Sequence, residues 1–313
     1  MTVFYLALSS VAMLLLVAMV GFIFIKRDMM KPDVIPALSK ILMYVCQPCL
    51  AVYSFSILEF STETLARLGL FALMVTVLHA VMIGGAYLVL RHKAKEAIYR
   101  ILILATTFSN CGFFGIPIIE ALLPEAASGL IVYTTVYSMV MNLFAWTVGS
   151  AIITGDVKYI SLKSTFLNPA VLGLAAALAL YLLRVDMPAP ALSMITMAGR
   201  MATPLSMLII GMRLALIDLK RLFTDYRIYL TSAVNQILMP LAVFAVMMLL
   251  PMVDPYLRKT LFILTACPVA SIVLNFAEIL GKGQGEAANT VLLSTVLSIV
   301  TLPFTMLLLP LIG

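Results

Sequence analysis

The chain has 313 residues, of which 63% are hydrophobic and only 11% are charged. Soluble domains carry about 25% charged residues, so this composition excludes a soluble protein and indicates an integral membrane protein. The formal net charge is +6. The basic residues lie in short loops between apolar runs, which indicates membrane topology rather than a nucleic-acid partner.

Apolar stretches of about 20 residues, the length that spans a bilayer, recur along the whole chain. The first stretch is too long for a signal-peptide core and has no basic residues before it, so we expect a retained span. The predicted spans are 4–25, 34–57, 66–90, 100–123, 127–153, 168–185, 191–213, 226–250, 258–281 and 287–311. The expected fold class is therefore an all-α membrane protein with ten transmembrane helices.

Lysine and arginine are concentrated in every second loop. These loops carry Lys26, Arg27 and Lys31; Arg91, Lys93, Lys95 and Arg100; Lys158 and Lys163; Lys220, Arg221 and Arg227; and Lys282. The intervening loops hold only Arg67, Arg184, Arg258 and Lys259. Because basic loops stay in the cytoplasm, we expect both termini outside it, in a cell inner or plasma membrane.

The two halves of the chain share a weak but ordered similarity. Leu-Ser pairs precede Pro48 in span 2 and Pro204 in span 7, and Arg100 and Arg258 open spans 4 and 9. We expect two repeats, 1–154 and 168–313, joined by a short cytoplasmic linker at 155–167. Since each repeat has an odd number of helices, the two would insert in opposite orientations.

Spans 4 and 9 both contain residues that interrupt a helix. Span 4 reads Ser-Asn-Cys-Gly-Phe-Phe-Gly-Ile-Pro at 109–117, and span 9 has Pro268 near its middle with Asn275 beyond it. Irregular backbone survives at membrane depth only where protein or a wet cavity shelters it. The alternative for Pro268 is a plain kink, but matching positions in two halves favour a paired site with two broken helices.

The same residues resemble the auxin efflux carrier family, the bacterial relatives of PIN-type plant carriers, which includes malonate and malate permeases. The resemblance rests on 109–117, on Thr-Pro-Leu-Ser-Met-Leu-Ile-Ile-Gly at 203–211, on Cys267-Pro268 and on the helix at 292–303. It covers essentially the whole chain. PIN-type plant carriers differ by a long cytoplasmic loop where this chain has only 155–167.

The resemblance implies a fold shared with bile-acid sodium symporters. Spans 1, 2, 6 and 7 would form a scaffold, through which a homodimer is a further expectation, and spans 3–5 and 8–10 would form a transport core. Spans 4 and 9 would cross at their unwound centres and hold the substrate there. The core would then move against the scaffold like an elevator.

Polar and helix-breaking residues at the two breaks are the candidates for substrate binding. They are Asn110, Gly112 and Pro117 in span 4 and Pro268, Ser271 and Asn275 in span 9. The N-terminus of a half-helix offers free N–H groups and partial positive charge, which suit an anion. Asn110 has the alternative of only capping a half-helix, and sodium near Asn110 and Asn275 is a second expectation for these amides.

Arg200 is a further candidate for substrate binding, because it lies four residues before Pro204 in an apolar span. A guanidinium can form two parallel hydrogen bonds to a carboxylate, which suits a dicarboxylate or other organic anion. The alternative is that the long side chain reaches the outer membrane surface and serves only as an anchor. The sequence leaves both open.

Five further polar residues are candidates for coupling or proton relay, each with a structural alternative. They are His79 in span 3, Asn235 and Gln236 in span 8, and Glu120 and Glu278 beyond the breaks. A histidine can exchange a proton near neutral pH, or can simply hydrogen-bond across helices. The glutamates would gate or couple transport, or would cap helices near the membrane faces.

The sequence contains no nucleophile beside a base, no phosphate-binding loop and no histidine cluster, so we expect no enzyme, cofactor or resident metal. The four cysteines lie in apolar segments and read as small core thiols. The leading hypothesis is a secondary transporter that exports small carboxylates, with no co-ion required. The alternatives are a sodium- or proton-coupled symporter for uptake and a receptor that binds without transport. Expected partners are a small carboxylate and membrane lipid.

Overall fold

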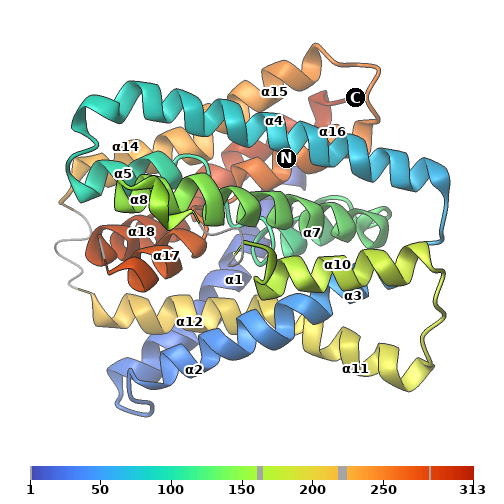
Figure 1. Cartoon of the computed structure of the whole chain (residues 1–313), viewed down its shortest axis with the longest axis horizontal. Coiled ribbons are helices and arrows are strands. Elements are labelled where there is room, and N and C mark those ends of the chain that lie inside the picture. The colour runs from blue at the N-terminus through green and yellow to red at the C-terminus, as the bar shows by residue number, and fades with distance from the viewer. Residues whose placement is uncertain (1, 161–164, 218–223, 282) are drawn as a thin grey trace.

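The computed structural model describes residues 2–160, 165–217, 224–281 and 283–313 (Figure 1). Within these ranges the chain is helical and has no strand, apart from one isolated antiparallel bridge between Ser109 and Val269. The all-α prediction is therefore confirmed for the described part. Four of the basic loop residues, Lys163, Lys220, Arg221 and Lys282, lie outside these ranges, and the orientation of the termini stays a prediction.

Seven helices of the described residues are long and apolar enough to cross a membrane. They cover seven of the ten predicted spans, and the other three correspond to shorter helices. In chain order the α-helices are α1 (Thr2–Lys26), α2 (Val34–Ile41), α3 (Gln47–Ser56), α4 (Thr62–Leu90), α5 (Ala97–Ala105), α6 (Gly115–Leu122), α7 (Ala127–Phe144), α8 (Ser150–Thr154), α10 (Pro169–Leu182), α11 (Ala189–Arg200), α12 (Ala202–Leu216), α14 (Tyr226–Ala233), α15 (Met239–Met248), α16 (Pro255–Ala266), α17 (Ile272–Leu280) and α18 (Gln284–Met306).

Wider π-helical turns join several of these helices into longer ones. One at Leu42–Cys46 links α2 to α3, and one at Val234–Leu238 links α14 to α15. Each comes directly before a helix with proline in its first turn, Pro48 or Pro240. Proline cannot donate the i→i−4 hydrogen bond, and a π-turn accommodates the lost bond without ending the helix.

The helices pack as two groups. The lower group consists of α1–α3 and α10–α12, and the upper group consists of α4–α8 and α14–α18. Figure 1 shows α2, α3, α10, α11 and α12 in the lower part of the view and α4, α14, α15 and α16 in the upper part. Contacts between the groups run mainly from α1 to α18 and α6, and from α3 and α10 to α7.

The closest helix packing in the lower group is between α1 and α12. A Cβ added to Gly21 would lie 2.1 Å from the carbonyl oxygen of Leu208, and one added to Gly211 would lie 1.7 Å from that of Ala18. Glycine is therefore required at both positions. Small residues at helix crossings let backbones approach closely inside a membrane, where packing rather than the hydrophobic effect drives association.

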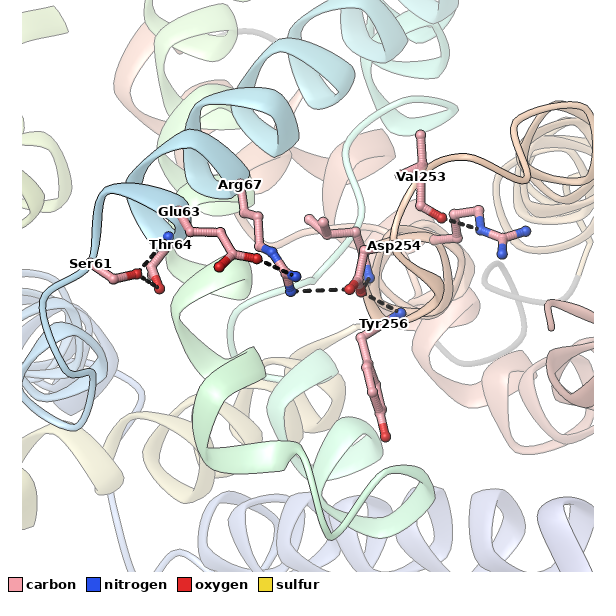
Figure 2. Close-up of polar contacts among 9 residues, drawn as sticks. Ser61, Glu63, Thr64, Arg67, Val253, Asp254 and Tyr256 are labelled. Carbon is pink, nitrogen blue, oxygen red and sulfur yellow. Dashed lines mark hydrogen bonds and ion pairs between the residues drawn. The ribbon is translucent and has the colours of Figure 1, made fainter.

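An ion-pair cluster ties two helix starts of the upper group together (Figure 2). Arg67 of α4 donates to Glu63 at 2.8 Å and to Asp254 at 3.0 Å. Asp254 also caps α16 by accepting from the backbone N–H of Tyr256 at 2.8 Å. The carboxylate of Asp254 therefore caps the N-terminus of α16 and also binds Arg67 of α4.

Candidate functional site

The site is built around two segments where the helices stop inside the protein. Helix α5 ends at Ala105 and α6 begins at Gly115, while α16 ends at Ala266 and α17 begins at Ile272. The residues between them are not helical, and most are buried. The first segment overlaps the stretch at 109–117 that the sequence singles out, although 115–117 belong to α6, and the second segment contains Pro268.

The two non-helical segments pair with each other through their backbones. The N–H of Asn110 donates to the carbonyl of Pro268 at 2.6 Å, and the N–H of Ala270 donates to the carbonyl of Phe108 at 2.8 Å. A third hydrogen bond runs from the N–H of Val269 to Ser294 Oγ at 3.1 Å. Backbone groups that lack helical partners are thereby satisfied away from water, as burial demands.

Side chains of α7 and α16 pack closely around the first segment. Ser109 Oγ donates to the Tyr137 hydroxyl at 3.2 Å, and the Cys111 sulfur lies 3.1 Å from Ser138 Oγ. A Cβ at Gly115 would lie 2.5 Å from a methyl of Leu264. The start of α6 therefore packs closely on α16, and a side chain at Gly115 would require Leu264 to move.

A cavity of about 120 Å³ lies beside the paired segments, between the two helix groups. A single water needs roughly 10–15 Å³ of such space, so the cavity has room for several waters or a small organic molecule. Its polar lining from the lower group is Ser39, Gln47, Asn168, Ser206 and Arg213, and that from the upper group is Asn110, Thr134, Thr135, Ser138, Asn142, Ser271 and Asn275. Gln47 and Asn142 each contribute an amide to this lining.

Two hydrogen-bond donors in this lining have no partner within the protein. Asn110 is only 4% exposed, and its side-chain nitrogen makes no hydrogen bond. The buried hydroxyl of Ser271 is also unpaired, although this residue directly precedes α17 and could have capped it. Buried polar groups nearly always have partners, so these two are available to a ligand.

The N-terminus of α17 faces the same cavity. Ser271, Ile272, Leu274 and Asn275 all line it. The first N–H groups of a helix have no intrahelical partners and carry partial positive charge. The cavity therefore combines a helix N-terminus with an unpaired amide and an unpaired hydroxyl, which together favour an anion.

Arg213 is the one charged side chain among the described residues that line the cavity. It lies on α12 and forms an ion pair with Glu278 of α17. Sequence reasoning missed Arg213, because it stands near the end of a predicted span and reads as a flanking charge. The available signal was that α12 and α17 each contain a single charged residue, and these two carry opposite charges.

A model of a family described as membrane transport protein matches residues 6–162 and 154–306 of this chain. The chain belongs to this family, the membrane transport proteins of the auxin efflux carrier family. It is therefore a multi-pass membrane transporter, and its family is not one of enzymes. A comparison with curated proteins finds no match.

The transporter brings four of the predicted binding residues together at the cavity: Asn110, Gly112, Ser271 and Asn275. Pro268 contributes its carbonyl to the pairing of the two segments rather than to the cavity lining. Pro117 lies in the first turn of α6, also outside the lining. No group of three or more histidine, cysteine or acidic residues that could hold a metal occurs in the described ranges.

Arg200 lies outside the cavity of this transporter, although the sequence presents it as a candidate anion ligand. Its guanidinium donates to the Tyr53 hydroxyl at 3.0 Å and lies 5.5 Å from the centre of the Tyr53 ring. The Glu120 carboxylate, on α6, lies within electrostatic range of Arg200. Arg200 is exposed on the outside of the helix bundle.

His79 is fully buried, with its ring near Phe108 of the first non-helical segment, but it does not line the cavity of the transporter. Its ring stacks on Phe144 at 5.6 Å and contacts Tyr137 edge-on at 5.1 Å. The Nδ1 atom lies 2.9 Å from the Val75 carbonyl, and Nε2 has no partner. Since a carbonyl only accepts, Nδ1 carries the proton and Nε2 is left as an acceptor.

Asn235 and Gln236 link the π-turn between α14 and α15 to neighbouring elements. Asn235 donates to the carbonyl of Thr106, at the end of α5, at 3.4 Å. Gln236 donates to the carbonyl of Ser294 at 2.7 Å and accepts from the Thr301 hydroxyl. Both amides therefore connect helices of the upper group, and neither lines the cavity.

Proposed function

We propose that this transporter is a secondary carrier of small organic anions, including mono- and dicarboxylates, and that the anion occupies the cavity beside the paired segments. One observation carries the proposal. Asn110 and Ser271, whose side-chain donors are unpaired, line the same small cavity as the first turn of α17 and Arg213. No acidic side chain is among the described residues that line it.

The chemistry of this lining favours an anion over a neutral or cationic solute. Amide, hydroxyl and backbone N–H donors all bind oxygen acceptors, and hydrogen bonds to an ionised acceptor are roughly twice as strong as neutral ones. Aliphatic and aromatic side chains, among them Phe113 and Trp146, form the rest of the lining. A carboxylate on a short organic body would contact both kinds of surface.

The proposed architecture is ten spans arranged as two inverted repeats, 1–154 and 168–313, with both termini outside the cytoplasm. Corresponding packing supports it: α4 packs on α7 as α14 packs on α18, and α6 packs on α7 as α17 packs on α18. Corresponding charges support it as well. Glu120 follows Arg100 by 20 residues, and Glu278 follows Arg258 by the same 20.

In this arrangement the lower group is the scaffold and the upper group is the transport core. The cavity is lined from both groups, so a shift of the core along the scaffold would change which side of the membrane it opens to. An elevator motion of this kind would carry the paired segments and their substrate together. The helix N-terminus would move with the anion throughout.

Export driven by the membrane potential is the leading proposal for direction. An inside-negative potential favours exit of an anion by ~2.3 kcal/mol per charge per 100 mV, so no co-ion is needed. The alternative is coupled uptake. The amide oxygens of Asn110 and Asn275 are then the proposed sodium ligands, and Nε2 of His79 the proposed proton acceptor.

The test is flux in proteoliposomes loaded with radiolabelled malonate, malate, 2-oxoglutarate or indole-3-acetate. We expect at least one of them to move when a potential is imposed, without a sodium or proton gradient. Flux only with a sodium or proton gradient would support the coupled alternative. Binding without flux under every gradient would contradict the carrier proposal.

A further inference from the structure

The ion pair between Arg213 and Glu278 joins the two helix groups at the edge of the cavity. Arg213 belongs to α12 of the lower group and Glu278 to α17 of the upper group. Both terminal nitrogens of the guanidinium bind a carboxylate oxygen of Glu278, with Nη2 3.2 Å from Oε2. Of the ion pairs formed by the described residues, this is the one that connects the groups.

The two partners differ in how deeply they lie in the protein. The side chain of Arg213 is 14% exposed, whereas that of Glu278 is 44% exposed. Arg213 also lines the cavity, and Glu278 does not. A charge buried without a partner is costly, so Arg213 needs a carboxylate at all times, while Glu278 can be solvated when released.

We infer that Arg213 binds the carboxylate of the substrate, and that Glu278 occupies this guanidinium while the cavity is empty. An entering carboxylate then replaces Glu278 on the same fork of N–H donors. One anion is exchanged for another, so Arg213 stays paired while the substrate binds. The inference rests on the proposed function and names the residue that selects for carboxylates.

The exchange also changes how the two groups are connected. Binding of a carboxylate to Arg213 releases Glu278 and so removes the direct ion pair between α17 and α12.

The protein contains its own optical probe for testing this exchange. Trp146 is the single tryptophan of the chain, lines the cavity, and contacts the ring of Phe276 at 4.5 Å between ring centres. Its fluorescence can be titrated with malonate, malate and 2-oxoglutarate in purified protein. Equilibrium dialysis with these compounds and with indole-3-acetate, all radiolabelled, gives a second measure of affinity.

Two variants, Arg213→Gln and Glu278→Gln, are expected to shift the affinity for carboxylates in opposite directions. Arg213→Gln removes a charged hydrogen-bond fork, so carboxylate binding weakens roughly tenfold or more. Glu278→Gln removes the internal competitor, so binding tightens, by roughly tenfold if Glu278 holds Arg213 as firmly as a substrate does. Arg67→Gln is the matched control, because it removes guanidinium–carboxylate pairs remote from the cavity, and its affinity stays at the wild-type value.

A purely structural ion pair would instead weaken binding in both variants, which would overturn the inference. Equal affinities of Glu278→Gln and wild type would also overturn it. If Arg213→Gln does not fold, the double variant Arg213→Gln/Glu278→Gln, which leaves no charge unpaired, takes its place and must bind at least tenfold more weakly. Absence of binding and flux in the wild type itself would count against the proposed function, whereas normal wild-type transport with unshifted variants would count against this inference alone.

Discussion

Arg100 and Arg258 make the same pattern of hydrogen bonds at the starts of α5 and α16. Each Nε donates to the loop just before its own helix, Arg100 to Ala94 O at 2.5 Å and Arg258 to Val253 O at 2.9 Å. Each guanidinium also donates to a carbonyl of another segment. Arg100 donates to Ile153 O, in α8, at 3.3 Å, and Arg258 donates to Gly313 O at 2.9 Å. Two residues 158 positions apart therefore connect their own helix starts to other segments of the chain in the same way.

Replacing Arg258 by glutamine should destabilise the transporter. The residue is 6% exposed and its donors satisfy three carbonyls, so their loss costs about 1–3 kcal/mol. Thermal unfolding in detergent measures the effect. Lys259→Gln, which removes the adjacent positive charge, is the control and should unfold close to wild type. Equal unfolding temperatures for the two variants would contradict the anchoring role.

Asn110→Ala should abolish or strongly reduce anion flux while leaving the protein folded. The side-chain nitrogen has no partner in the protein, so its removal costs no internal hydrogen bond and relieves a buried unsatisfied donor. Carboxylate affinity should fall roughly tenfold. Ser232→Ala is matched to it, because that hydroxyl is likewise buried and unpaired but lies outside the cavity. A loss of flux in both would point to packing rather than binding.

Arg200→Gln should leave carboxylate affinity unchanged, because Arg200 does not line the cavity. The expected loss is in stability, about 0.5–1.5 kcal/mol for the hydrogen bond to the Tyr53 hydroxyl. Binding and thermal unfolding of the same preparation separate the two effects. A tenfold fall in affinity with normal stability would return Arg200 to the anion site.

Gly211→Ala should disrupt the crossing of α1 and α12. The added Cβ would lie 1.7 Å from the carbonyl oxygen of Ala18, which forces the helices apart at an expected cost of about 1–3 kcal/mol. Gly69→Ala on α4 is the comparison, because its Cβ would meet nothing within 4 Å and alanine favours a helix. The folded fraction of each variant after extraction measures the difference, and equal fractions would contradict the close approach.

The pH dependence of stability should report the ion pair at the start of α14. Hydrogen bonds from Arg227 lower the pKa of Asp225 below its ordinary value of 3.8. A lowered pKa means that the pair stabilises the fold above the unfolded-state pKa and that this contribution disappears as the pH falls through the folded-state pKa. Asp225→Asn should therefore be less stable than wild type at pH 7, and the difference should shrink as the pH falls below about 4 and vanish below the folded-state pKa. A constant difference across this range would exclude the ion pair as its cause.

Sequence reasoning located much of the site because the determining features are local. Glycines and prolines interrupt the two apolar stretches. Gly112 and Pro268 lie in the non-helical segments, and Gly115 and Pro117 lie in the first turn of α6, directly after the first segment. The membrane class and the family followed from composition and from the motif at 109–117. Each of these signals is contained within a few consecutive residues.

The two arginines of the 189–216 region could not be ranked from sequence for a physical reason. Position along a helix can be counted, but the direction that a side chain faces depends on every turn before it. Arg200 and Arg213 are 13 residues apart, so at 3.6 residues per turn they lie on opposite faces of the helical span Ala189–Leu214. The structure shows which face meets the cavity, because Arg200 contacts Tyr53 and Arg213 lines the cavity.

The two hydrogen bonds that join the non-helical segments connect main-chain atoms only, from Asn110 to Pro268 and from Ala270 to Phe108. Substitution of the side chains at these positions would leave those donors and acceptors in place, except where proline replaced a donor. The backbone pairing of the segments is thus independent of the side chains that line the cavity. Relatives with the same pairing could carry other cavity side chains and accept a different solute without a change in the backbone of these segments.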